Sequence, residues 1–276
     1  MSVQEGKLTA MKKVLRSPQT QGDGAMTTTT AGTPLTYRGL SVVLPAWNEA
    51  ANIHATIEAV VATLSAIAPN FEVIIVDDGS ADATGSIADT LAAEDARVRV
   101  IHHPTNQGYG AAVISGFDAA AKELLFFMDS DGQFDIKDIA HLIIPFEQGE
   151  ADVILGYRKH RQDAPMRILN AWAWKQLVSF LFHLQIRDID CAFKLMPTRL
   201  VQIANVHARG AMVNTELLAK FVRMGVHMVQ VPVGHYPRRA GKATGANLRV
   251  ILNAFRELFR LAAKLRTWSP PPDAQY

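Results

Sequence analysis

Short apolar runs alternate with segments of helical periodicity from residue 40 to residue 157. The apolar runs are LSVVLPA (40–46), FEVIIVDDGS (71–80), RVRVIHH (97–103), LLFFM (124–128) and DVILGY (152–157). The helical patterns between them cover 50–67, 83–94, 108–121 and 136–148. Strands that alternate with helices of this length predict an α/β fold: a Rossmann-like, mostly parallel sheet with helices on both faces and right-handed crossovers.

The pattern changes after Tyr157. The expected elements there are an aromatic-rich helical stretch within 166–188, a short strand near 191–196, a helix near 213–224, a strand at 226–233 and a last helix. Residues 1–38 lack periodicity and are expected to form a disordered leader. This leaves 39–246 as one domain, 247–268 as a basic amphipathic helix and 269–276 as a disordered tail.

Composition permits one large domain. The chain has 276 residues, of which 49% are hydrophobic and 20% are charged, enough for a substantial core. Cys191 is the single cysteine, so an internal disulfide is excluded and a reducing compartment fits. The sequence contains no 18 consecutive apolar residues and no signal-peptide pattern, so we expect no membrane-spanning helix.

Charge is unevenly distributed along the chain. The net charge is +2, but the segment 237–268 alone carries +7, so the remainder carries −5. The basic residues of this segment are Arg238, Arg239, Lys242, Arg249, Arg256, Arg260, Lys264 and Arg266. A basic end on an otherwise acidic protein predicts a polyanionic partner, for which nucleic acid and an anionic bilayer both qualify.

Carboxylates follow two of the predicted strands. Asp77 and Asp78 end the second run, and Asp129 and Asp131 come directly after LLFFM. Ligands of open α/β sheets bind beyond the carboxyl ends of the strands. Mg²⁺ or Mn²⁺ would relieve the repulsion between the last two carboxylates, since these ions prefer carboxylate oxygen. The alternative is a turn in which aspartate caps the next helix.

Other common site patterns are missing. Gly108 and Gly110 begin a glycine fingerprint, but Val113 occupies its third position and the stretch does not follow a strand end. The sequence has neither a Walker loop nor a G-x-S-x-G elbow. His102 and His103 are adjacent, which suits no helical zinc chelate.

Five motifs, in this order, carry a family resemblance: VLPAWNEAANI, VDDGSADAT, NQGYGAA, MDSDGQ and ILGYR. Together they resemble an A-type family-2 glycosyltransferase. The later DIDCAFKLM and VPVGHYPRRAG are similar to the polyprenyl-phosphate (dolichol-phosphate) mannosyl- or glucosyltransferases. The resemblance covers about residues 40–262. It implies the A-type glycosyltransferase fold and transfer of mannose or glucose from a nucleotide-diphosphate sugar to a polyprenyl phosphate, with inversion.

The resemblance also implies site residues. The pocket for the nucleotide sugar would be lined by Pro45, Trp47, Glu49, Val76 and Asp78. The diphosphate and its Mg²⁺ or Mn²⁺ would be held by Asp129, Ser130, Asp131 and Gln133, with Asp129, Asp131 and Gln133 as the metal ligands. For Trp47 and Val76 the alternative is ordinary core packing.

Two arginines match phosphate-binding positions of the family. Arg158 follows DVILGY, and Arg238 lies in the segment that closes over the sugar donor. Guanidinium suits both places because its planar fork binds phosphate bidentately. With Asp131, these arginines are the expected catalytic residues. Better-known members have a lysine where this chain has Thr244, so Lys242 would have to replace that contact.

The acceptor determines what else is needed. A lipid monophosphate is already a strong oxyanion near pH 7 and needs no general base. It needs cations, for which Arg161 and Arg167 are candidates, with a solvated loop as the alternative. The second enzyme hypothesis, a sugar hydroxyl or glycolipid acceptor, requires a base, and Asp188 or Asp190 would supply it.

The membrane hypothesis follows from a lipid acceptor. The stretch 166–188 mixes Trp172 and Trp174 with flanking arginines and fits either the bilayer interface or a core helix. In the last helix, basic residues form one stripe and apolar residues fill the rest. We therefore expect a cytoplasmic enzyme, peripherally attached to an anionic membrane, with no nucleic-acid partner. The sugar donor stays open between GDP-mannose and UDP-glucose. A non-catalytic membrane or nucleic-acid binding protein is the remaining alternative.

Overall fold

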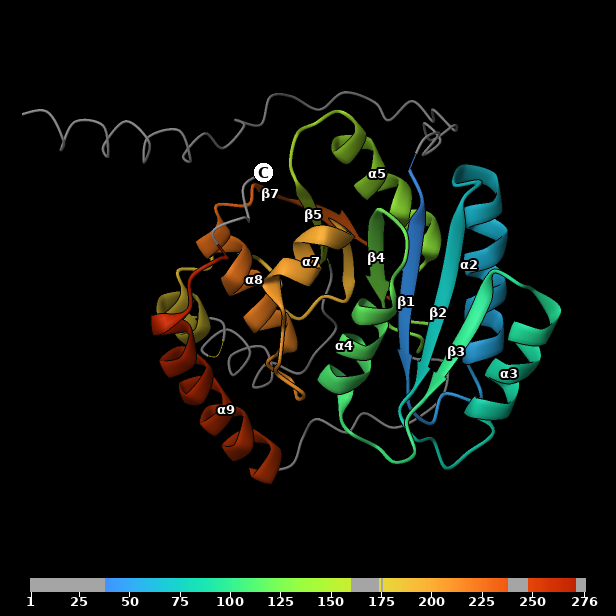
Figure 1. Cartoon of the computed structure of the whole chain (residues 1–276), viewed down its shortest axis with the longest axis horizontal. Coiled ribbons are helices and arrows are strands. Elements are labelled where there is room, and N and C mark those ends of the chain that lie inside the picture. The colour runs from blue at the N-terminus through green and yellow to red at the C-terminus, as the bar shows by residue number, and fades with distance from the viewer. Residues whose placement is uncertain (1–37, 160–173, 175, 238–247, 272–276) are drawn as a thin grey trace, which may run out of the picture. The chain divides into compact units, whose positions relative to one another are not determined.

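The computed structural model describes residues 38–159, 174, 176–237 and 248–271, with the backbone alone for 248–254. Its centre is a seven-stranded sheet of order β3-β2-β1-β4-β6-β5-β7 (Figure 1). The strands are β1 (Leu40–Ala46), β2 (Phe71–Asp77), β3 (Val98–His102), β4 (Leu124–Met128), β5 (Val153–Arg158), β6 (Phe193–Pro197) and β7 (Met228–Val233). Only β6 is antiparallel to its neighbours, so the predicted mostly parallel sheet is confirmed.

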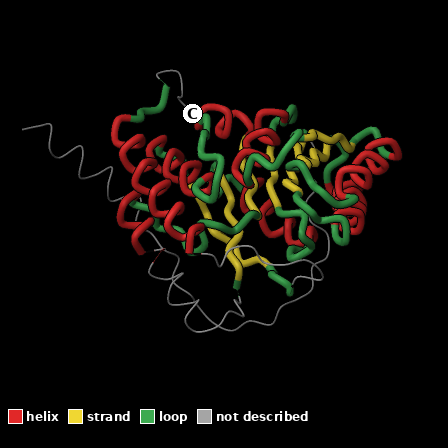
Figure 2. The backbone as a smooth tube through the Cα atoms, turned by 90° about the horizontal axis from the view of Figure 1, so that it is seen from below, coloured by secondary structure: helices red, strands yellow, loops and turns green. Residues whose placement is uncertain are grey.

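Helices connect and cover these strands (Figures 1 and 2). They are α2 (Ile53–Ile67), α3 (Thr84–Glu94), α4 (Tyr109–Ala119), the 3₁₀ turn η1 (Ile136–Asp138), α5 (Ile139–Glu147), α7 (Thr198–Ala204), α8 (Val213–Met224) and α9 (Leu248–Thr267). Since β2 and β4 flank β1 on opposite sides, right-handed crossovers place α2 and α3 on one face and α4 on the other. α7 and α8 pack beside α4.

The predicted elements are found with small shifts. The helix expected from residue 50 begins at Ile53, and the one expected over 136–148 begins as a 3₁₀ turn capped by the Asp135 side chain. α7 was not predicted, because its seven residues are too few for a clear period. The expected leader and tail, 1–38 and 269–276, lie almost entirely outside the described residues.

Burial is complete where the apolar runs are continuous. All five residues of β4 are buried, and Phe126 packs edge-on against Phe193 of β6 with ring centroids 4.7 Å apart. The small Gly116 allows α4 to approach β1 and β2, since a Cβ there would collide with the Val43 side chain. The sheet is thus fixed from both faces, and its strand ends are held in register.

The aromatic-rich stretch is helical in its described part, residue 174 and residues 176–182. Val178 and Phe182 are buried, whereas Phe180 is 78% exposed. Core packing is therefore found on one side of this stretch, while one aromatic ring faces solvent; a place in the bilayer interface stays a prediction. Trp172 lies outside the described residues.

The last helix packs on α8. Leu258, Leu261 and Leu265 of α9 are buried. Lys220 of α8 lies 5.3 Å from the Trp268 ring centroid. The pattern of apolar positions predicted that part of this helix covers the sheet. The described contacts of α9 include α8, where Lys264 Nζ lies 3.9 Å from Glu216, and Trp174, whose ring centroid lies 5.1 Å from that of Phe255. No helix in the described ranges is long and apolar enough to cross a membrane.

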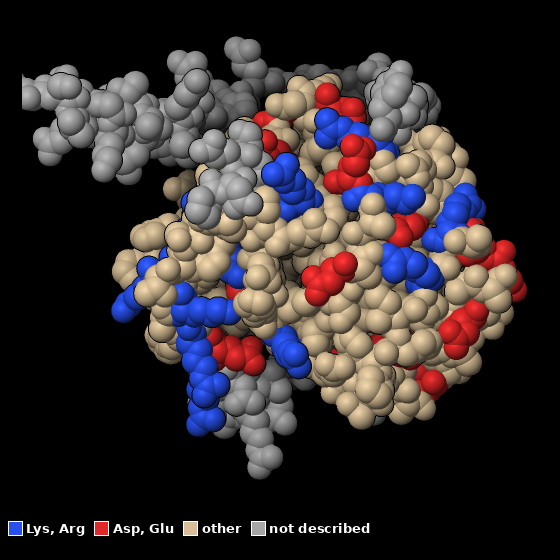
Figure 3. Space-filling view, viewed as in Figure 1, with Lys and Arg blue, Asp and Glu red and all other residues tan. Residues whose placement is uncertain are grey.

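The opposite side of α9 stays open to solvent. Phe255 and Phe259 are 37% and 57% exposed, and Arg256 and Arg260 beside them are exposed too. Figure 3 shows lysine and arginine side chains gathered along this helix. The basic stripe predicted from the sequence is therefore found together with two exposed aromatic rings.

Truncating the inner face of α9 should destabilise the protein. Leu258→Ala and Leu265→Ala should each lower the free energy of unfolding by about 2–5 kcal/mol, because both side chains are completely buried. Phe259→Ala, on the outer face, is the matched control and should change it by about 0.5 kcal/mol or less. Urea denaturation of the full chain measures this; equal effects at inner and outer positions would contradict the packing.

Candidate active site

The carboxyl ends of β2, β1 and β4 lie side by side, because the three strands are parallel neighbours. The segments predicted to bind the nucleotide sugar follow these ends. Ser130 Oγ donates to the Pro45 carbonyl at 2.7 Å, and Asp78 N donates to the Ala46 carbonyl at 2.9 Å. The structure therefore brings 45–49, 76–78 and 129–133 together at one edge of the sheet.

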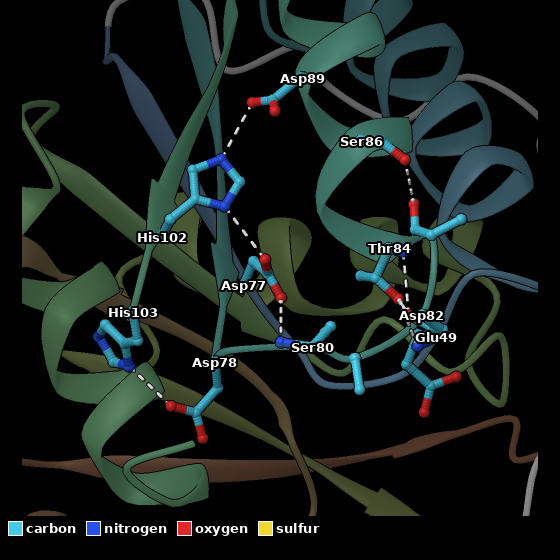
Figure 4. A network of polar contacts seen from close by, with 12 residues as sticks. Glu49, Asp77, Asp78, Ser80, Asp82, Thr84, Ser86, Asp89, His102 and His103 are labelled. Carbon is cyan, nitrogen blue, oxygen red and sulfur yellow. Dashed lines mark hydrogen bonds and ion pairs between the residues drawn. The ribbon is translucent and has the colours of Figure 1, made fainter. Parts of the chain in front are cut away.

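A polar network holds the first loop of this edge in place (Figure 4). Glu49 N donates to Thr84 Oγ1 at 2.8 Å, and Ala50 N donates to Asp82 at 3.2 Å. Asn48, at a φ of 55°, exchanges hydrogen bonds with the segment of Ser80. The motif DDGSADAT thus orients the loop that presents Trp47, whose side chain is 43% exposed.

Not every residue predicted to line the nucleotide pocket has a solvent-accessible side chain. Val76 is completely buried, so core packing describes its side chain. The hydroxyl of Ser130 is turned inward to Pro45, and its residue is 2% exposed. Glu49 is buried and accepts a hydrogen bond from Asn52 at 2.8 Å. Trp47 is the member of this group whose side chain is accessible.

The Asp78 carboxylate has hydrogen-bond partners within the protein itself. His103 Nδ1 lies 2.7 Å from Asp78 Oδ1 (Figure 4). The backbone N–H groups of Gln107 and Gly108 donate to the same carboxylate at 2.9 Å. The neighbouring pair is similar, since His102 lies between Asp77 and Asp89, 3.0 Å from each. Both aspartates raise the pKa of His102 through these hydrogen bonds. The histidines, excluded as a zinc pair, serve to hold strand-end carboxylates.

Asp129 and Asp131 are the carboxylates of interest beyond β4. Burial and the negative charge of Asp131 raise the pKa of Asp129 to about 7. Asp131 is 7% exposed and accepts the Gln133 N–H at 3.0 Å. Tyr109 donates its hydroxyl to Asp129 at 2.9 Å, and burial together with the Asp129 charge raises the pKa of Tyr109, so the phenol keeps its proton.

This pair fits a hard divalent cation. A cation would relieve the repulsion that the raised pKa of Asp129 reports. The Gln133 side-chain nitrogen donates to the Tyr236 carbonyl at 3.0 Å, which leaves the amide oxygen as a further ligand of the right chemistry. The described residues contain no cluster of three or more His, Cys, Asp or Glu that could hold a metal by itself. Two carboxylates suffice only where substrate phosphates complete the shell.

Arg158 differs from its predicted geometry. Its Nε and Nη2 bind Asp188 at 2.6 and 2.8 Å, and the side chain is 16% exposed. The fork expected to bind phosphate is thus occupied by a carboxylate. The segment just before Asp188 is held to β7 by hydrogen bonds between Gln230 and residues 185 and 187. The contact with Arg158 takes Asp188, one of the two candidate bases, into an ion pair. Asp190, the other, is exposed.

Four further predictions cannot be placed. Arg161, Arg167, Arg238 and Lys242 lie outside the described residues. The segment that leads to Arg238 is described as far as residue 237. Tyr236 N donates to the Gln133 carbonyl at 2.9 Å, so this segment is tied to the carboxylate loop by two hydrogen bonds.

Two polar residues near the site were missed in the sequence. Tyr109 lies in the motif NQGYGAA without an assigned role. Lys194 of β6 is completely buried, donates to Asn214 Oδ1 at 2.9 Å and to the Cys191 carbonyl, and has a pKa lowered by burial. A lysine within the apolar run AFKLM was the available signal, since lysine is almost never buried without partners.

Comparisons with known proteins identify the family of the chain. Residues 41–220 match the family model described as glycosyl transferase family 2. Glycosyltransferase AglD of Haloferax volcanii is 32% identical over 83% of this chain, which spans 37% of that protein's length. Polyprenol monophosphomannose synthase of Mycolicibacterium smegmatis is 29% identical over 75% of this chain and 82% of its own.

The fold is shared with solved structures. Glucosyl-3-phosphoglycerate synthase from Mycobacterium tuberculosis, in complex with Mn²⁺ and UDP-glucose, superposes with a TM-score of 0.65, 21% identity and coverage of 86% of this chain and 81% of that one. At this identity the likeness shows the fold alone, and the expected A-type glycosyltransferase fold is confirmed. Because the family model spans most of the described chain, the protein belongs to glycosyl transferase family 2 and is a glycosyltransferase.

Proposed function

We propose that this glycosyltransferase moves a hexose from a nucleotide-diphosphate sugar to a polyprenyl phosphate, with inversion and with Mg²⁺ or Mn²⁺. The observation that carries the metal and the sugar donor is the pair Asp129 and Asp131 at the end of β4, with one carboxyl pKa raised to about 7. Such a pair needs a cation, and its shell needs a diphosphate. The complex of the mycobacterial synthase with Mn²⁺ and UDP-glucose supports this assignment.

The acceptor assignment rests on chemistry and on a relative. The name of the M. smegmatis relative specifies polyprenol monophosphomannose as the product. A phosphate oxyanion attacks the anomeric carbon without losing a proton, so no general base is required. This suits a site in which Asp188 is bound to Arg158. A sugar hydroxyl acceptor would leave Asp190 as the candidate base.

The residues of the chain then have distinct tasks. The cation, when bound, neutralises charge that grows on the leaving diphosphate. Asp129, Asp131 and Gln133 would hold it, and the exposed Trp47 offers an aromatic face to the base. Arg238 and Lys242 would contact the sugar donor, and Arg161 and Arg167 the acceptor phosphate. Arg158 would act with Asp188 attached, as part of an ion pair at the end of β5.

The enzyme meets its lipid through α9 in this proposal. The helix is anchored by its buried leucines, so its exposed side is presented as a rigid surface. That surface, which we call the outer α9 face, comprises Phe255, Arg256, Phe259 and Arg260. Aromatic rings and arginines are favoured in the headgroup region of a bilayer. Attachment would be peripheral, on the cytoplasmic side, and without nucleic acid.

One assay tests the transfer itself. The full chain is incubated with radiolabelled GDP-mannose or UDP-glucose, polyprenyl phosphate and Mn²⁺, and the organic phase is counted. We expect label from one sugar donor in the organic phase, released by mild acid. Label that appears only on a hydroxyl-bearing glycolipid would favour the alternative acceptor, and no transfer from either sugar donor would contradict the proposed donor and acceptor.

Loss of one site carboxylate should abolish transfer without unfolding. Asp131→Asn should lower kcat by about 100-fold or more, because charge on the leaving group is no longer neutralised. Its thermal midpoint should not fall, since the substitution removes repulsion. Asp118→Asn, at an exposed position of α4, is the control and should behave like the parent. Full activity of Asp131→Asn in EDTA would exclude the metal assignment.

Replacing the proposed clamp arginine tests the segment after β7. Arg238→Lys should lower kcat by about tenfold or more, because a point charge does not replace a bidentate fork on the diphosphate. Arg239→Lys is the adjacent control and should retain the parent kcat. Steady-state kinetics with the preferred sugar donor decide; identical values for both variants would make Arg238 an ordinary surface charge.

Membrane attachment should depend on the outer α9 face. Each basic residue near an anionic surface contributes about 1 kcal/mol, so Arg256→Gln with Arg260→Gln should weaken vesicle binding roughly 30-fold. Salt should weaken the parent similarly. A double control, Lys137→Gln with Arg199→Gln, removes two exposed charges elsewhere. Co-sedimentation with anionic vesicles measures this; equal losses in both double variants would refute a specific face.

A further inference from the structure

The hydroxyl of Tyr109 contacts one oxygen of a proposed metal ligand. It donates to Asp129 Oδ1 at 2.9 Å, from the first residue of α4 across to the end of β4. The ring lies against Phe127, with centroids 6.4 Å apart, so its direction is limited by packing. Asp129 therefore has one oxygen committed to the protein and the other left for a ligand.

The backbone around Tyr109 is held on both sides. Asp78 accepts the N–H groups of Gln107 and Gly108, and Gly108 has a φ of 100°, which disfavours any residue with a side chain. On the other side, a Cβ at Gly110 would collide with the Ala208 carbonyl. Gly108 and Gly110, which do not complete a dinucleotide fingerprint, therefore hold the backbone of Tyr109 in a fixed position.

A second residue, Asn214, lies near the Tyr109 phenol on its interior side. The Asn214 side chain is close enough to Tyr109 to oppose the rise in its pKa, and Asn214 Oδ1 accepts from Lys194 Nζ at 2.9 Å. Asn214 is 4% exposed and Lys194 is completely buried. Lys194 is fixed in turn by the carbonyl of Cys191 and, at 3.4 Å, by that of Ile189. A continuous row, Lys194–Asn214–Tyr109–Asp129, leads from the interior to the site.

We infer that Tyr109 is a positioning residue for the metal: its hydroxyl, fixed by the Gly108–Gly110 loop and by Asn214, sets the rotation of the Asp129 carboxylate toward the cation. The inference rests on the proposed metal-dependent function. Groups that orient a metal ligand in this way typically change metal affinity by about 10–100-fold when removed. A carboxylate without its partner would rotate freely and would lose part of its affinity for the ion.

Tyr109→Phe removes the hydroxyl and retains the ring. We expect the Kd for Mn²⁺, measured by electron paramagnetic resonance of the free ion in the presence of GDP or UDP, to rise about tenfold. The thermal midpoint should stay near that of the parent, and most of kcat should return at saturating Mn²⁺. Tyr157→Phe is the matched control, and its Kd should equal that of the parent.

The possible outcomes distinguish a failure of this inference from a failure of the proposed metal-dependent function. If the parent binds Mn²⁺ and Tyr109→Phe binds it equally well, Tyr109 has no positioning role, whatever happens to the thermal midpoint. If the parent itself binds no Mn²⁺ with either nucleotide, the metal assignment fails and this inference fails with it. A raised Kd with activity restored by added Mn²⁺ supports both.

Discussion

Two carboxylates confined at the end of β4 are the constraint on which the site depends. All residues of β4 are buried and the aspartates follow this strand closely, so neither aspartate can move away from the edge of the sheet. Burial and the nearby Asp131 raise the pKa of Asp129 to about 7, which reflects an electrostatic cost of holding two carboxylates in this loop. In the proposed function, a bound cation and diphosphate would remove that cost. The surrounding contacts keep the carboxylates in position for this exchange.

The contacts come from distant parts of the sequence. Ser130 is bonded to β1, Gln133 to the segment after β7, and Asp129 to the start of α4. These hydrogen bonds fix the loop before any ligand binds, and such preorganisation is what electrostatic catalysis requires. Gln133 holds Tyr236 through two hydrogen bonds, so the carboxylate loop is linked to the segment after β7.

Much of the fold could be predicted because buried parallel strands are continuously apolar and end in polar turns. This pattern located β1 to β5 and the acids after β2 and β4. It could not show that β6 inserts antiparallel between β4 and β5, since strand pairing is decided by contacts far apart in sequence. α7 was too short to show a helical period in its apolar residues. Arg158 was predicted to bind phosphate, but its partner Asp188 lies thirty residues away, and only tertiary structure reveals that the two bind.

Hydrogen bonds between residues far apart in the sequence also limited the prediction of the site. Asp78 was expected to face the nucleotide, and three of its hydrogen bonds come instead from His103 and the loop after it. Whether a carboxylate is open or engaged depends on which backbone amides reach it. Val76 illustrates the simpler case, in which a motif position is fully buried and contributes packing.

Calorimetric titration of the full chain with GDP and UDP, with and without Mn²⁺, tests the central claim most directly. The account predicts clear binding of one nucleoside diphosphate with Mn²⁺ and a large loss of affinity in EDTA, because the diphosphate completes the shell of an ion held by Asp129 and Asp131. Equal affinity in Mn²⁺ and in EDTA would contradict it, since the carboxylates would then repel the diphosphate that they are proposed to bind through the metal.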